Sequence, residues 1–126
     1  MYIKFKFDAQ ESMKIGNYER AIIELAMACE IYLRYSYFDY LPKDQLHEEV
    51  IKYIEEANIN QYLNQFFNRI VAVKERGKFK IIKKVISSLM SKRNSYMHMG
   101  VMKDVTLEKN REYLSAVENL FGIKKS

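Results

Sequence analysis

The chain has 126 residues and a formal net charge of +5, and its length suits one domain, 1–126, with a single core. An apolar content of 48% excludes a disordered chain, and one proline with four glycines excludes a linker-rich or collagen-like sequence. No apolar run approaches the roughly 18 residues of a membrane span, and Met1 to Phe7 does not resemble a signal peptide. We therefore expect a soluble, cytoplasmic protein without a membrane partner.

Two helices are predicted in the first third of the chain. A short helix from about Phe5 to Ile15 precedes Gly16, although the alternation from Tyr2 to Phe7 would also suit a strand. Asn17 is the expected cap of a long second helix, which should stop at Pro42. Its core-facing residues recur at steps of three and four: Ala21, Ile22, Leu25, Ala28 or Cys29, Tyr32 and Leu33.

Two further helices are predicted in the middle of the chain. Asp44 can cap the first, which would end near Asn58. Asn60 would open the second, and Gly77 would end it. Their expected inward residues are Leu46, Val50, Ile51 and Ile54 in the first, and Tyr62, Leu63, Phe66, Phe67, Ile70 and Val71 in the second.

The last two predicted helices complete an all-α bundle. One runs from Lys78 to about Met99 and is followed by Gly100, and the other is capped by Thr106 and ends before Gly122. Their expected core residues are Ile81, Ile82, Val85, Ile86, Leu89 and Met90, and then Leu107, Tyr113, Leu114, Val117, Leu120 and Phe121. Six helices, short loops and no convincing strand pair predict a single-domain helical bundle.

Positive charge is concentrated in and just before the fifth predicted helix. From Lys74 to Arg93 there are eight basic residues and one acid, Glu75, so this segment has a charge of +7 against +5 for the whole chain. Eleven of the sixteen acids lie between Asp8 and Glu56. The segment favours binding of a polyanion such as RNA, and an ordinary solvated helix face is the alternative. The expected RNA-binding lysines are Lys78, Lys80, Lys83, Lys84 and Lys92.

The same helix ends in the hexad Arg93-Asn94-Ser95-Tyr96-Met97-His98. Asn94 and His98 are four residues apart, so both project from one face, about one turn apart. Arg93 lies about 100° around the helix from Asn94, but its long side chain can bend toward the same place. Asn94 and His98 fall at the border of the apolar stripe, where a groove between helices or protomers can form. Gly100 just beyond would let a backbone or substrate approach closely.

Arginine, amide and imidazole groups suit the cleavage of an RNA phosphodiester without a metal or cofactor. Attack of the ribose 2′-hydroxyl needs a base, an acid for the 5′-oxygen and stabilisation of an anionic phosphorane. His98 can be the base or the acid, Arg93 can bind phosphate oxygens, and Asn94 can orient His98 or donate to the phosphate. Because one such histidine per chain is short of the usual pair, a symmetric homodimer with facing hexads would complete the site.

The hexad resembles the Arg-polar-x3-His signature of HEPN domains, small helical bundles that commonly dimerise. Arg93 to Gly100 is similar to the Arg-Asn-x3-His-x-Gly form, and Ala21 to Glu30 is similar to the early HEPN helix with its Ala-x-Glu feature. Many HEPN proteins are metal-independent endoribonucleases of toxin-antitoxin, phage-defence or RNA-processing systems. The resemblance implies that Arg93, Asn94 and His98 are catalytic. Glu30 would line the site, or would only cap or form a salt bridge.

One position departs from a subgroup of that family. Toxins paired with small nucleotidyltransferase antitoxins usually carry a tyrosine two residues after the histidine, where this chain has Gly100. Modification of such a tyrosine by a partner is therefore not supported, and Tyr96, inside the hexad, is only a candidate substitute that would line the site. A protein antitoxin or another defence-system partner is still an expectation of the resemblance.

Several features also have non-catalytic explanations. A HEPN-type module could bind RNA or protein without turnover, and His98 could be a helix-end histidine stabilised by the helix dipole. Gly16 to Ala21 is similar to part of a tetratricopeptide repeat, but no second copy follows at a distance of about 34 residues. The aromatic run from Tyr32 to Tyr40 could stack bases, although core or dimer packing explains it more simply.

The remaining reactive side chains, Cys29 and His47, have no neighbours in the sequence that would complete a catalytic or metal site. Cys29 is alone in an apolar pattern and is expected to be a small buried residue. His47 stands next to Glu48 and Glu49 in an acidic segment and is expected to be solvated. No spacing of His, Asp, Glu or Cys predicts a metal site, and no glycine-rich loop predicts a nucleotide cofactor.

Overall fold

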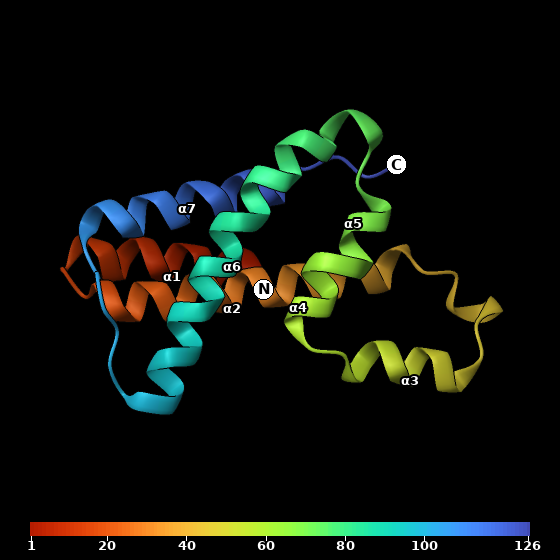
Figure 1. Cartoon of the computed structure of the whole chain (residues 1–126), viewed down its shortest axis with the longest axis horizontal. Helices are drawn as coiled ribbons and strands as arrows, with labels where there is room; N and C mark the ends of the chain where they lie inside the picture. Colours follow the sequence, from red (N-terminus) through yellow and green to blue (C-terminus); the bar gives the residue numbers. More distant parts are fainter.

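The computed structural model describes all 126 residues as one bundle of six helices without a sheet, which confirms the predicted all-α class (Figure 1). The helices are α1 (Tyr2–Lys14), α2 (Tyr18–Tyr40), α3 (Glu48–Glu56), α4–α5 (Ile59–Gln61 and Phe67–Ile70, joined by the π-helical residues Tyr62–Phe66), α6 (Arg76–Met99) and α7 (Leu107–Phe121). None of them has the length and apolar character that crossing a membrane requires.

Helix α2 is the centre of the bundle, because α1, α6 and α7 all pack against it. In Figure 1, α1, α2 and α7 run alongside one another and α6 crosses them. The apolar residues predicted to face the core from α2, from Ala21 to Leu33, are all buried, as expected. Cys29 is among them, and its burial raises the pKa of the thiol, which makes it a packing residue rather than a nucleophile.

Three of the predicted helix boundaries are confirmed. The Asn17 side chain accepts a hydrogen bond from the Arg20 amide at 3.3 Å, and the Thr106 hydroxyl accepts one from the Lys109 amide at 3.2 Å. Both bonds satisfy amides that the first helical turn leaves without a partner. At the end of α6, Gly100 adopts a φ of 69°, a left-handed conformation that glycine tolerates best.

The predicted starts of α1, α3 and α4 need correction. Residues from Tyr2 are helical, so the alternative of an N-terminal strand is wrong. Asp44 lies in a short 3-10 turn, and the cap of α3 is His47, whose ring nitrogen accepts from the Glu49 amide at 3.1 Å. Asn58, not Asn60, begins α4, because Gln61 three residues later completes a reciprocal capping box with it.

The chain turns after α5 because the C-terminal tail pairs with it. The Ala72 amide donates to the Lys124 carbonyl at 2.9 Å, and the Ser126 amide donates to the Ile70 carbonyl at 2.8 Å. These bonds use backbone groups that a continuing helix would need, so α5 ends at Ile70 rather than at Gly77. Gly77 instead lies in the first turn of α6, which begins at Arg76.

Two residues predicted to be core residues lie on the surface, namely Val50 (45% exposed) and Ile81 (70% exposed). Ile81 is about 100° around α6 from the buried Ile82, which places it on the outer side of the helix. The aromatic run divides in a similar way. Tyr32 and Tyr37 are buried in the core, while Tyr35 and Tyr40 are exposed.

Candidate functional site

The hexad occupies the last turns of α6, where this helix extends past α1 and α2 (Figure 1). Asn94 and His98 are exposed and lie one turn apart on the same face, as their spacing predicts. The His98 ring has no hydrogen-bond partner within the chain, so both of its nitrogens are free to meet another molecule. Helical periodicity alone is enough to bring these two groups together.

Arg93 is turned toward the interior and joins the hexad to α2. One of its terminal nitrogens, Nη1, donates to the Glu30 carboxylate at 2.8 Å, and the Arg93 side chain is only 18% exposed. The other, Nη2, lies 3.5 Å from the Asn94 side-chain oxygen. This contact leaves the Asn94 amide NH₂ as the end that can donate to a bound group.

Glu30 is itself held between two arginines. Its second oxygen accepts from Arg34 at 3.3 and 3.4 Å, one turn further along α2. Arg34 also lies 4.8 Å above the Tyr62 ring and donates to the Glu55 carbonyl at 3.3 Å. The resulting chain of contacts connects α6, α2, α3 and the π-helical segment, and it fixes the position of the Arg93 guanidinium.

Tyr62 anchors the far end of this chain of contacts. Its hydroxyl donates to the Ile54 carbonyl at 2.6 Å, and its ring is completely buried. Burial raises the pKa of the Tyr62 hydroxyl, and the nearby Arg34 charge acts in the opposite direction. The hydroxyl is therefore protonated, as its hydrogen bond to the Ile54 carbonyl requires.

Replacing Glu30 by glutamine is expected to destabilise the fold by about 1–2 kcal/mol, because it leaves two partly buried arginines without a counter-charge. Urea unfolding followed by circular dichroism measures this loss. Glu11→Gln is the matched control, since the Glu11–Lys14 pair is about 70% exposed on both sides and should contribute at most about 0.5 kcal/mol. Equal unfolding midpoints for the two variants would contradict the bridging role of Glu30.

A pocket of about 380 Å³ opens beside Asn94 and His98. It lies between α6 and the start of α4, which contributes Asn60. The α6 residues that line it are Ser87, Met90, Ser91, Asn94, Ser95, His98 and Met99. No acidic side chain is among the lining residues, and most of them can donate a hydrogen bond, so the pocket suits an anion.

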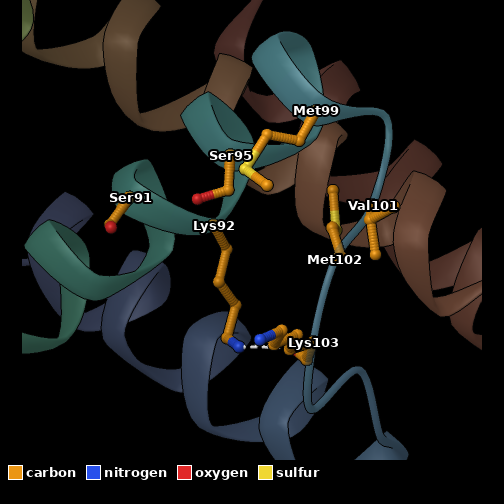
Figure 2. Close-up of a pocket in the computed structure, with 7 residues that line it drawn as sticks. All are labelled: Ser91, Lys92, Ser95, Met99, Val101, Met102 and Lys103. Atoms are coloured by element: carbon orange, nitrogen blue, oxygen red, sulfur yellow. Dashed lines mark hydrogen bonds between the residues drawn. The ribbon is translucent and has the colours of Figure 1, made fainter.

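A second pocket, of about 390 Å³, lies on the other side of Ser95 and is shown in Figure 2. Lys92 extends from α6 across it and donates to the Lys103 carbonyl at 2.6 Å. Met99, Val101 and Met102 form its apolar wall. Met99 and Val101 are 76% and 58% exposed, so an apolar surface adjoins the hexad.

The lysines predicted to bind RNA do not share one face of α6. At about 100° per residue, Lys80, Lys83 and Lys84 lie within about one quarter-turn of the Asn94–His98 face. Lys78 and Lys92 lie on other sides of the helix, and Lys92 is engaged with the Lys103 carbonyl. Only three of the five therefore lie on the same side of α6 as the candidate site, about 15–27 Å from it along the helix axis.

Of the two candidate site-lining residues, only Glu30 contacts a candidate catalytic side chain, that of Arg93. Tyr96 lies nearly opposite Asn94 and His98 around α6, where it is partly buried against the core. Gly100 has nothing within 4 Å of the place where a side chain would begin, so its left-handed backbone, rather than a close contact within the chain, requires glycine.

Sequence reasoning missed four residues of the site, namely Arg34, Ser87, Ser91 and Asn60. Arg34 follows Glu30 by four residues, a spacing that predicts a pair on one helix, so this contact was available from the sequence. Ser87 and Ser91 precede Asn94 and His98 at helical spacing and could have been found in the same way. Asn60 could not, because only the tertiary arrangement places α4 across the pocket from α6.

No group of three or more His, Cys, Asp or Glu side chains is arranged to hold a metal ion. Comparison with known proteins adds no assignment: no family model, curated protein or solved structure matches this chain. The candidate site must therefore be interpreted from its own residues.

Proposed function

We propose that this protein is a HEPN-type endoribonuclease that cleaves RNA without a metal ion, at a site shared by two copies of the chain. The observation that carries the proposal is the pairing of Asn94 and His98 on an exposed face of α6, with the Arg93 guanidinium 3.5 Å from the Asn94 side chain and an acid-free pocket alongside. Imidazole, guanidinium and amide are the groups that this reaction requires.

In the proposed reaction, His98 of one protomer takes the proton from a ribose 2′-hydroxyl. The 2′-oxygen then attacks the adjacent phosphorus, and the bond to the 5′-oxygen breaks. His98 of the second protomer gives a proton to that leaving oxygen. The products are a 2′,3′-cyclic phosphate and a free 5′-hydroxyl, so all atoms and charges balance without another reactant.

Arg93 and Asn94 would stabilise the extra negative charge of the phosphorane. The link from Arg93 to Glu30 holds the guanidinium in place before substrate binds, so little reorganisation is needed during the reaction. The free amide NH₂ of Asn94 supplies a neutral donor to the same phosphate. Glu30 would thus be a positioning residue and not a catalytic one.

The surroundings of the hexad support a dimer. Met99 and Val101 are 76% and 58% exposed, and together they line an apolar surface at the end of α6 next to His98. Exposed apolar residues gathered beside a polar site are typical of protein contacts. A symmetric dimer that covers this surface would bring the two hexads toward each other. A partner such as a protein antitoxin is the other occupant that this surface could take.

Cleavage of RNA in the presence of a chelator tests the proposal. Purified protein is expected to cut single-stranded RNA in EDTA and to leave 2′,3′-cyclic phosphate ends, which mass spectrometry identifies. RNA whose riboses carry 2′-O-methyl groups lacks the nucleophile and should stay intact. Cleavage of that methylated RNA, or products that all end in 5′-phosphate, would overturn the proposed chemistry.

A non-catalytic RNA-binding or protein-binding module is the second candidate. The observation in its favour is that no side chain of the same chain orients the His98 ring. Such a module would bind RNA in a salt-dependent manner without turnover, and binding would survive His98→Ala. A helical adaptor without RNA affinity is the third candidate, and retention of a protein partner without any RNA would identify it.

A further inference from the structure

One face of α6 carries a continuous line of hydrogen-bond donors that leads to the hexad. The positions recur at steps of three and four residues, so they lie along one side of the helix. They are Lys80, Lys83, Ser87, Ser91, Asn94 and His98, named here the donor track. Every member is exposed or half-buried.

The donor track has three chemical zones. Two ammonium groups, on Lys80 and Lys83, stand at its N-terminal end, and neither takes part in a salt bridge. Two serine hydroxyls follow in the middle. The candidate catalytic residues Asn94 and His98 occupy the last zone. No acidic and no large apolar side chain lies between these positions on this side of the helix. A surface of this kind is suited to binding the phosphate backbone of a nucleic acid.

The C-terminal part of the track is a groove and not a flat surface. Ser87, Ser91, Asn94 and His98 line the 380 Å³ pocket, and Asn60 of α4 faces them from the opposite wall. An unpaired nucleotide can place its base and phosphate between these side chains, whereas a duplex keeps its bases paired and stacked, so the groove favours a single strand.

Resting on the proposed function, we infer that the substrate is a single-stranded RNA segment that lies along the donor track. The strand would contact Lys80 and Lys83 with its phosphates, pass between Asn60 and the two serines, and place the scissile phosphate at Asn94 and His98. From Lys80 to His98 the helix rises about 27 Å. That distance corresponds to roughly five nucleotides of an extended single strand.

The donor track includes some lysines of α6 and leaves out others, although each of them contributes the same charge to the helix. Lys78 and Lys80 are neighbours in sequence and both are exposed, but they lie about 160° apart around α6. Only Lys80 belongs to the donor track. Lys78 therefore provides a control of the same charge on the same helix.

Binding of 2′-O-methyl oligouridylates, which cannot be cleaved, tests the inference by fluorescence anisotropy. We expect affinity to rise with length up to about five or six nucleotides and then to level off. Lys80→Ala combined with Lys83→Ala should weaken binding about tenfold at low salt and reduce the salt-dependence slope by about 1.4, or 0.7 for each lost phosphate contact. The control combines Lys78→Ala with Lys4→Ala, which removes the same charge away from the track and should change affinity by less than about threefold.

Neutral methylphosphonate linkages give a second measurement that leaves the protein unchanged. Two neutral linkages, about four and five nucleotides from the cut, should weaken binding as the paired lysine substitutions do, and two placed well beyond the track should not. Equal losses from the two pairs of lysine variants, or duplex RNA binding as tightly as single strands, would overturn the donor track.

The two proposals fail in different ways. If oligonucleotides bind with this dependence on length and on the two lysines but unmodified RNA is never cut, the proposed nuclease activity is wrong. The donor track would then remain as an RNA-binding surface. If RNA is cut while Lys80 and Lys83 behave like the control pair, the nuclease stands and the donor track is wrong.

Discussion

Replacing His98 by alanine is expected to lower the rate of RNA cleavage by about 10²–10⁴-fold, because the site would lose both its general base and its general acid. In a dimer of variant chains, the two imidazoles disappear together. Helical structure should be unaffected, since His98 is exposed and makes no hydrogen bond within the chain. Initial rates on a fluorescent single-stranded RNA in EDTA, measured beside circular dichroism spectra, check both statements.

The chain offers one matched control, because His47 is its only other histidine. His47 is also exposed, but it caps α3 far along the chain from the hexad. Changing it to asparagine, which caps helices well, should leave the cleavage rate within about twofold of the original. Full cleavage by His98→Ala protein would rule out the mechanism proposed above, and a similar loss in both variants would point to a general effect of removing a histidine.

A dimer with a single His98 should be almost inactive, and this is the second large effect that we expect. If each composite site uses both imidazoles, a mixed dimer of one original and one His98→Ala chain has no complete site. Its cleavage rate should therefore fall by about 10²-fold or more. Two independent sites, by contrast, would leave about half of the activity.

Mixed dimers can be isolated by producing the two chains together with different affinity tags and purifying on both tags in turn. A mixed dimer that pairs an original chain with a His47→Asn chain serves as the control and should keep full activity. Retention of about half of the activity by the mixed His98 dimer would show that each chain acts alone. Elution of the active protein as a monomer would exclude the shared site altogether.

Most of the fold follows from local features of the sequence. The apolar spacing of α2 predicted which side would be buried, and Asn17, Thr106 and Gly100 marked the ends of helices through their own side-chain or backbone preferences. The predicted helix boundaries were wrong where two nearby residues could each cap the same helix. Asp44 and Asn60 are good capping residues, but His47 and Asn58 made the caps, the latter because Gln61 completes a capping box.

The predicted end of α5 was wrong for a different reason. Nothing near Ile70 in the sequence marks a stop, and the apolar pattern continues through Val71. The stop depends on hydrogen bonds with Lys124 and Ser126, more than fifty residues away in the chain. A pairing over such a distance cannot be recognised from local periodicity.

The contacts of the hexad are likewise of two kinds, those that helix geometry predicts and those that depend on tertiary packing. By itself the sequence determined that Asn94 and His98 share one face at the end of a basic helix, because 3.6 residues per turn place positions four apart together in any α-helix. Only the tertiary structure decided that Arg93 turns inward to Glu30 and that Asn60 faces the serines of α6. The first kind of contact depends on helix geometry alone. The second depends on which helices pack together and on which side of α6 the core lies.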